Sequence, residues 1–240
     1  MNPSSKIAVL DSGIGGTTTL REVRKLLPSE DFLYFGDSKN CPYGEKTDAE
    51  LLEISRENVR RLLKEDIKLI VVACNTLTTR VLKTLREEFK EIAFIGTEPA
   101  LKPALESPYK NILILSTPAT ARSLEPKLSA ALKENPEKTV LNLPCPGLAA
   151  AIESRDDALI SETLKKNLAP LPEATRQSIE IIVLGCTHYP IIKEKIKSNF
   201  PNAELLDGNA GVAHRVKEIL EQKNLLNQTP ASGVVEYIYT

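Results

Sequence analysis

The sequence lacks an excess of charge of either sign. Its 240 residues carry 31 basic and 32 acidic side chains, a formal net charge of -1, and no polybasic tail or arm. A dedicated nucleic-acid binder concentrates positive charge to contact phosphates, so we expect no nucleic-acid partner here. A small anionic substrate is compatible with this balance, because one pocket can be polar in a neutral protein.

Long apolar runs are also missing. No apolar stretch approaches the roughly 20 residues that span a bilayer, and residues 1–6 do not have the layout of a signal peptide. We therefore expect a cytoplasmic protein that does not contact a membrane. With 42% hydrophobic residues, the chain can still bury one large core or two smaller ones.

Cysteine and histidine are scarce. The four cysteines are widely spaced, with no Cys-x-x-Cys pair: Cys41, Cys74, Cys145 and Cys186. This spacing argues against a zinc site or a thioredoxin-like motif, so we expect no metal. A reducing cytoplasm would keep all four as thiols. Of the two histidines, we expect His214 to be structural.

What the sequence does contain is an alternation of short apolar runs with longer amphipathic segments. We expect strands at 7–10, 32–35, 69–73, 93–95, 112–115, 140–143, 179–184 and 204–206. We expect helices at about 18–27, 48–64, 78–89, 121–132, 148–167, 191–198 and 209–223. Strands separated by helices indicate parallel sheets covered by helices on both faces. Ligands of such sheets bind at the carboxyl ends of the strands.

The two halves of the chain contain similar motifs in the same order. A strand ending at Asp11-Ser12 is followed by the run Leu69-Ile-Val-Val-Ala-Cys-Asn-Thr76, and a strand ending at Ser116-Thr117 by Ile181-Ile-Val-Leu-Gly-Cys-Thr187. Each half places a cysteine with a hydroxyl neighbour about 60 to 70 residues after a hydroxyl-bearing turn. We infer an α/β fold of two similar lobes, each a largely parallel sheet flanked by helices. We expect a pseudo-twofold relation between the lobes, with the active site in the cleft between them.

Two of the cysteines lie at positions typical of catalytic residues. Cys74 and Cys186 follow apolar runs directly, whereas a structural cysteine belongs inside one. Amide donors and the dipole at a helix N-terminus favour a thiolate there. A thiol with an ordinary pKa of about 8.5 needs only modest help to ionise near neutral pH. We therefore predict functional roles for both.

Two thiols facing one pocket suit the inversion of a carbon centre, which needs a base on one face and an acid on the other. Pyridoxal phosphate often stabilises the carbanion in such reactions, but no lysine stands out for it, although one sequence does not exclude one. We expect a reaction without a cofactor, which requires rigidly held proton donors and acceptors and dipoles for the developing charge. Ser12, Asn75, Thr76 and Thr187 could hold an amino acid's carboxylate and ammonium groups.

Asp11 and His188 are candidates for tuning the thiols. His188 lies two residues beyond Cys186, placed to raise its thiolate content or to assist proton transfer. Asp11 closes the first strand, and the alternative role is to cap the following turn. That turn, Gly13-Ile-Gly-Gly16, has neither dinucleotide-binding nor P-loop spacing, so a nucleotide site is the weaker alternative to close approach by a small carboxylate.

Taken together, several motifs resemble the aspartate/glutamate racemase family, and within it the members that act on glutamate. They are Asp11-Ser-Gly-Ile-Gly-Gly16, Tyr34-Phe-Gly-Asp37, Pro42-Tyr-Gly44, Ala73-Cys-Asn-Thr76, Glu98-Pro-Ala-Leu-Lys-Pro103 and Gly185-Cys-Thr-His-Tyr-Pro190. They occur in the family's order and cover nearly the whole chain. The resemblance implies a lobe of residues 1–98 and 207–240 and a second lobe of 99–206. It also implies interconversion of L- and D-glutamate without metal or pyridoxal phosphate, supplying D-glutamate to peptidoglycan.

The resemblance assigns roles to individual residues. Cys74 would take the proton from D-glutamate with help from Asp11, and Cys186 would take it from L-glutamate with help from His188. Glu153 matches a further acidic residue near the second cysteine. The substrate site would be lined by Asp11, Ser12, Pro42, Tyr43, Gly44, Asn75, Thr76, Thr117, Thr120, Thr187 and His188.

The chain departs from the family pattern in places. Ser116-Thr117 replaces a more usual Gly-Thr, and Asp207-Gly-Asn-Ala210 a commoner Asp-Ser version. Asp37-Ser-Lys-Asn-Cys41 replaces Asp-Thr-Ala-Arg and places Cys41 beside the substrate loop, which we interpret as incidental. The N-terminus lacks the extension with which some members bind a peptidoglycan-precursor activator, so we expect no such regulation.

Other functions remain open at this stage. Aspartate racemase, hydantoin racemase and maleate isomerase share the two cysteines, although Pro42-Tyr-Gly44 and Glu98–Pro103 favour glutamate. A non-catalytic binding protein is an alternative from another class, and retention of both cysteines and His188 argues against it. Some family members restrain DNA gyrase, an interaction that nothing in this sequence supports. Family members commonly form homodimers, so we expect one here.

Overall fold

The computed structural model describes residues 2–240 and divides them into two compact units. The first unit contains the chain up to Thr97 together with Asn209–Thr240, and the second is Glu98–Gly208. Among residues 2–240, no helix combines the length and the apolar character that crossing a membrane requires.

The first unit is built on a five-stranded parallel sheet in the order β4-β3-β1-β2-β9. Its strands are β1 (Lys6–Asp11), β2 (Phe32–Gly36), β3 (Ile67–Val72), β4 (Ala93–Gly96) and β9 (Val235–Tyr239). Strands β2 and β3 are buried along their whole length, because helices cover both faces. This explains their almost continuous Val, Ile, Leu and Phe content. Since all strands are parallel, their carboxyl ends share one edge of the sheet.

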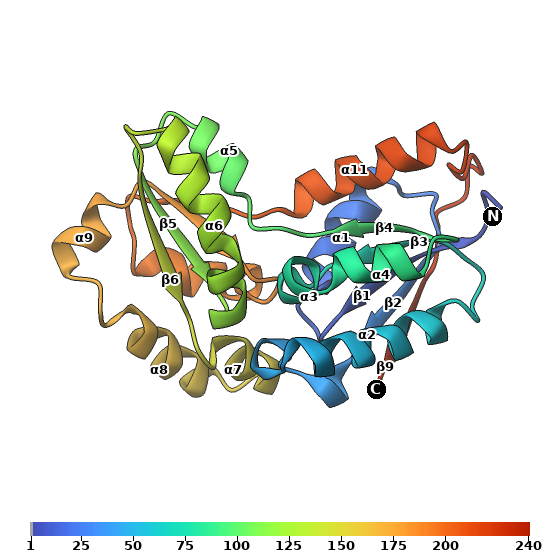
Figure 1. The fold of residues 1–240 in the computed structure, drawn as a ribbon, viewed down its shortest axis with the longest axis horizontal. Helices are drawn as coiled ribbons and strands as arrows, with labels where there is room; N and C mark the ends of the chain where they lie inside the picture. Colours follow the sequence, from blue (N-terminus) through green and yellow to red (C-terminus); the bar gives the residue numbers. More distant parts are fainter. Residues whose placement is uncertain (1) are drawn as a thin grey trace. The chain divides into compact units, whose positions relative to one another are not determined.

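Two groups of helices cover the faces of this sheet (Figure 1). Helices α1 (Thr17–Leu26) and α11 (Asn209–Gln222) pack on the face that presents Val9 and Val71. Helices α2 (Asp48–Leu62), α3 (Asn75–Arg80) and α4 (Leu82–Glu88) pack on the other face. Short 3-10 helices occupy Ser38–Asn40 and Tyr43–Glu45 in the loop after β2.

The second unit has a four-stranded parallel sheet in the order β6-β5-β7-β8. Its strands are β5 (Asn111–Ser116), β6 (Thr139–Pro144), β7 (Ile181–Gly185) and β8 (Glu204–Leu206). Helices α5 (Leu101–Glu106) and α6 (Pro118–Glu134) cover one face. The other face packs against α7 (Leu148–Ser154), α8 (Asp157–Leu168), the 3-10 helix Tyr189–Ile192 and α10 (Lys193–Ser198).

Two parallel sheets flanked by helices confirm the predicted α/β fold class. The predicted helix at 78–89 is instead two helices, because the backbone leaves helical geometry at Val81. The predicted helix at 148–167 is also interrupted, at Arg155, which adopts a left-handed conformation with φ of 59°. Helices α5 and α9 (Glu173–Ser178) and strand β9 were not predicted. Strand β9 is partly exposed along its length, so it lacks the apolar run that marked the other strands.

Candidate active site

In the first unit, the turn after β1 folds around the carboxylate of Asp11. This side chain is fully buried, and its Oδ2 accepts hydrogen bonds from the Gly16 amide at 2.9 Å and the Gly13 amide at 3.3 Å. A Cβ at Gly16 would lie 2.6 Å from the Asp11 Cβ, so the turn requires glycine there. The capping role that the sequence left open for Asp11 is therefore confirmed. The two amides are occupied by the chain's own carboxylate, which weakens the phosphate-loop alternative.

A buried polar network lies at the end of the neighbouring strand β2. Asp37 accepts hydrogen bonds from the Tyr43 hydroxyl at 2.7 Å, the Asn58 side-chain amide at 2.9 Å and the Thr240 hydroxyl at 2.8 Å. Burial alone would raise the pKa of this carboxyl. The hydrogen bonds from Asn58, Tyr43, Thr240 and Asn40 together outweigh it and hold the pKa of Asp37 below its usual range. Asp37 is thus a fixed negative charge next to the predicted substrate loop.

Tyr43 is a buried member of this network. Its side chain is only 2% exposed, and burial, followed by the Asp37 charge, raises the pKa of its hydroxyl well above the ordinary value. Charges on Cys74 and Asp11 raise the pKa of this hydroxyl further. Tyr43 therefore stays neutral and donates its proton to Asp37, while Pro42 and Gly44 beside it are half-buried.

Cys74 lies at the junction of β3 and α3, as predicted. The Leu77 amide points at its Sγ at 3.5 Å, so a negative charge on the sulfur has a backbone donor. The thiol side chain is 6% exposed. Asn75 donates to the Thr97 carbonyl at 3.2 Å, and Thr76 is buried beside it. Ser12 is buried too, at the same edge of the sheet.

In the second unit, a histidine joins a thiol to a carboxylate. Cys186 follows β7 directly, and its Sγ lies 3.6 Å from Nδ1 of His188. Nε2 of the same ring is hydrogen-bonded to the carboxylate of Glu153, near the end of α7. Cys186 and His188 are buried, while Glu153 is partly exposed. A carboxylate orients the imidazole and stabilises its protonated form, so this triad can carry a proton to or from the sulfur.

A second thiol lies close to this triad but is chemically different. Burial, with the Cys186 charge adding to it, raises the pKa of Cys145 to about 12. Tyr189, fully buried, donates its hydroxyl to the Cys145 carbonyl at 3.5 Å, and burial raises the pKa of that hydroxyl well above its ordinary value. Cys145 therefore stays protonated near neutral pH and serves as part of the core.

The predicted threonines lie at the strand ends of the same unit. Thr117 begins α6 and accepts a hydrogen bond from the Thr120 amide at 3.3 Å. Its hydroxyl lies 3.1 Å from that of Thr120, which is fully buried. Ser116 pairs with Gly185 across β5 and β7, so Thr117 and the Cys186-Thr187 segment follow adjacent strand ends. Thr187 is also buried.

The structure thus collects the predicted residues at one sheet edge in each unit. Sequence reasoning missed Asp37 and Asn58, which fix Tyr43. Asp37 could have been predicted as a site residue, since it follows a buried strand at the same edge as Asp11. Asn58 lies within α2, and its sequence position indicated no such role. His214 is exposed on α11. Taken unit by unit, residues 2–240 gather no three His, Cys, Asp or Glu ligand atoms within reach of one metal ion.

Comparison with known proteins identifies the family. The Asp/Glu/Hydantoin racemase family model matches residues 18–216. The chain is 39% identical to a glutamate racemase of Clostridium acetobutylicum, over 97% of this chain and 91% of the relative. It is 41% identical to one of Leptospira interrogans, over 95% of this chain and 88% of the relative. The crystal structure of Francisella tularensis glutamate racemase with D-glutamate is similar, with a TM-score of 0.80 and 29% identity, covering 99% of this chain and 89% of that one.

The resemblance seen in the motifs is thereby confirmed. The chain belongs to the Asp/Glu/Hydantoin racemase family.

Proposed function

We propose that this chain interconverts L- and D-glutamate by moving the α-proton between substrate and two cysteine thiols, without a cofactor. The observation that carries the proposal is the Cys186–His188–Glu153 triad at the end of β7. It stands in a chain that is about 40% identical to glutamate racemases over nearly its whole length. Thiols suit this task because a thiolate is a weakly hydrated base.

On the side of the first unit, Cys74 would remove the proton from D-glutamate. The Leu77 amide supports the thiolate form, and Asp11 would assist as a fixed carboxylate that can accept the thiol proton. Because the Asp11 carboxylate is held by backbone amides of the glycine turn, its orientation does not depend on the substrate. Rigid placement of the base is what a reaction without an electron-sink cofactor requires.

On the side of the second unit, Cys186 would remove the proton from L-glutamate. The His188 imidazole can accept the thiol proton through Nδ1, and the Glu153 carboxylate stabilises the imidazolium that results. When the same thiol returns a proton to the carbanion, His188 resupplies it. Inversion requires both thiols to reach one α-carbon from opposite faces.

Polar groups at the two sheet edges would bind the rest of the substrate. We assign the substrate carboxylates to hydroxyl, amide and backbone N–H donors and the ammonium group to oxygen acceptors. We keep the full predicted set: Asp11, Ser12, Pro42, Tyr43, Gly44, Asn75, Thr76, Thr117, Thr120, Thr187 and His188. The hydroxyl of Tyr43 contributes mainly by fixing the loop, since it already donates to Asp37. We propose residues 1–98 with 207–240, and 99–206, as the functional lobes.

The product D-glutamate would supply peptidoglycan synthesis in the cytoplasm, and we propose a homodimer as the working form. These statements are supported by the family resemblance of the sequence.

The test is circular dichroism of L-glutamate incubated with the purified protein in D2O, without added cofactor and with L-aspartate in parallel. We expect the glutamate signal to decay as deuterium enters at the α-carbon. Decay with aspartate only would assign the related aspartate activity instead. No change with either amino acid would contradict racemisation and favour a binding role.

A further inference from the structure

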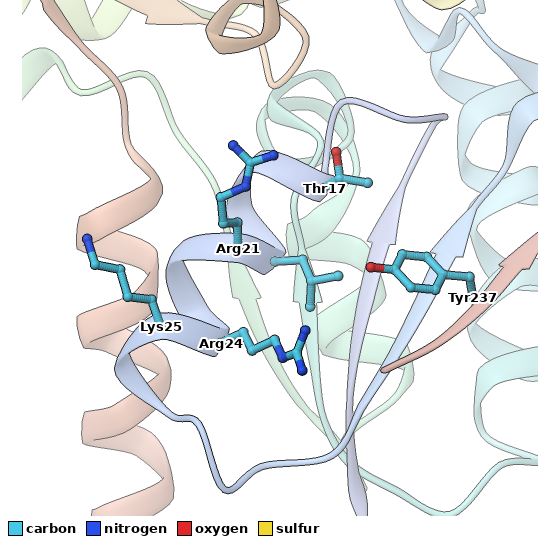
Figure 2. A pocket seen from close by; sticks show the side chains of 6 residues that line it. Thr17, Arg21, Arg24, Lys25 and Tyr237 are labelled. Carbon is cyan, nitrogen blue, oxygen red and sulfur yellow. The ribbon is translucent and has the colours of Figure 1, made fainter. Parts of the chain in front are cut away.

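A basic groove lies in the first unit, between helix α1 and strand β9 (Figure 2). Its volume is about 360 Å³, and it is lined by Thr17, Leu20, Arg21, Arg24, Lys25 and Tyr237. This volume falls in the range of about 300–1,000 Å³ that small-molecule sites occupy. None of these residues takes part in the site built around Asp11 and Cys74, so the function proposed above assigns no role to the groove.

Helix α1 supplies the positive charge. Residues 17, 20, 21 and 24 follow the helical i, i+3, i+4, i+7 spacing, so they share one side of the helix. Arg21, Arg24 and Lys25 are exposed, and within residues 2–240 none of the three forms an ion pair with a carboxylate. Like charges three or four residues apart on a helix repel each other. A bound anion would relieve that repulsion.

Strand β9 supplies an aromatic ring. Tyr237 lies opposite Tyr34 in the sheet register, with ring centroids 5.8 Å apart, yet 53% of it is exposed because β9 is an edge strand. Figure 2 shows its hydroxyl directed from β9 toward α1, with Arg24 extending from the helix on the same side. The Arg24 guanidinium donates to the Gly233 carbonyl at 3.5 Å, which holds it near the start of β9.

We propose that this groove binds a small phosphorylated anion. Guanidinium groups match the oxygens of phosphate with paired N–H donors, and the Lys25 ammonium adds a point charge. The Tyr237 ring offers a surface on which a planar base can stack. A nucleoside diphosphate therefore uses every element of the groove, whereas pyrophosphate uses only the cations. The proposal does not depend on the activity toward glutamate.

The test is isothermal titration calorimetry of the intact protein with ADP and, separately, with pyrophosphate. We expect saturable binding at one site that weakens as salt is raised, because the contacts are ionic. In the double variant Arg21→Gln/Arg24→Gln we expect affinity to fall about tenfold or more, since two charge-assisted contacts are lost. The matched control is Arg60→Gln/Lys64→Gln, which removes one exposed charge from α2 and one from the turn after it, and should leave affinity unchanged.

Tyr237→Ala distinguishes the two sources of phosphate. A loss of affinity for ADP alone would identify a nucleotide as the ligand, and equal, unaltered binding of both anions would identify an inorganic diphosphate. Either result supports the site, provided that thermal melting shows each variant folded. Absence of saturable binding to the unmodified protein would overturn the proposal. Equal weakening by the Arg21→Gln/Arg24→Gln and Arg60→Gln/Lys64→Gln variants would overturn it too, since it would show unspecific attraction.

Discussion

The Nδ1 atom of His188 lies 3.6 Å from the Sγ atom of Cys186, and the opposite ring nitrogen is bonded to the Glu153 carboxylate. Nearby, burial raises the pKa of Cys145 to about 12. Two buried thiols of one unit thus have different partners: Cys186 has the His188 imidazole, whereas Cys145 lies beside the fully buried Tyr189 hydroxyl. This contrast supports Cys186 as the base of the second unit and Cys145 as part of the core.

Replacement of either proposed base should abolish racemisation. Cys74→Ala and Cys186→Ala each remove one of the two groups that exchange the α-proton, so we expect kcat to fall by about a thousandfold or more. Far-UV circular dichroism should remain that of the unmodified protein. Cys41→Ala is the matched control, because this thiol has no assigned role, and its activity should be retained. Full activity in either base variant would contradict the two-base mechanism.

Glu153 should act through His188. Glu153→Gln keeps the size of the side chain but removes the charge that stabilises an imidazolium, so we expect kcat to fall by about a hundredfold. Because the two enantiomers are equal in energy, kcat/KM must fall equally in both directions. Glu162→Gln, at a position on α8 with an exposed side chain, is the control and should be neutral. Unchanged kcat in Glu153→Gln would remove Glu153 from the mechanism.

The glycine turn should tolerate no side chain at residue 16. In Gly16→Ala the new Cβ would meet the Asp11 Cβ at 2.6 Å, so the turn must shift and move the carboxylate. We expect both lower activity and a free energy of unfolding reduced by about 1–3 kcal/mol. Gly211→Ala, where nothing lies within 4 Å, should instead be neutral or slightly stabilising. Urea titrations and rates with L-glutamate check both variants, and a neutral Gly16→Ala would refute the packing argument.

Asp37 should make stability depend on pH in the acid range. Since its pKa in the folded protein is below the ordinary value, the unfolded chain binds the proton more readily. The stabilisation is present above the ordinary pKa of about 3.9 and is lost as pH falls toward the lower value. Asp37→Asn should lower the free energy of unfolding at pH 7 by about 1–3 kcal/mol.

Urea unfolding at pH 7 and pH 3 measures this effect. The difference between the unmodified protein and Asp37→Asn should shrink at pH 3, where the carboxyl begins to take up its proton. Asp157→Asn, which alters a mostly exposed carboxylate paired with Lys195, should show little difference at either pH. A constant difference for Asp37→Asn would show that its charge does not stabilise the fold.

Breaking the buried ion pair of the first unit should cost more stability than breaking a surface pair. The Lys68 ammonium, on β3, lies 2.5 Å from the Glu30 carboxylate, and both side chains are at most 2% exposed. Removing one partner leaves a buried charge, so Lys68→Met or Glu30→Gln should each cost about 3–5 kcal/mol. The double variant should cost less than the sum of the two. The exposed pair Arg215–Glu218 is the control, worth at most about 1 kcal/mol.

The sequence by itself determined the strand and helix alternation and the residues at the strand ends. Asp11, Cys74 and Cys186 each follow an apolar run directly, and that order is a local property of the chain. A parallel sheet places all such ends at one edge, so the location of these residues followed from strand order alone. His188 was equally predictable, since it lies two residues from Cys186.

Only the tertiary structure decided which distant residues meet. The Asp37 network joins residues 37, 43, 58 and 240, and β9 pairs with β2 from the far end of the chain. The family resemblance placed Glu153 only near the second cysteine, and the structure shows its carboxylate hydrogen-bonded to His188. Hydrogen bonds of this kind depend on distances between elements that the periodicity of a sequence does not encode. The local sequence pattern determines where each helix or strand forms. Burial of apolar side chains and hydrogen bonding of polar groups between elements determine which elements pack together.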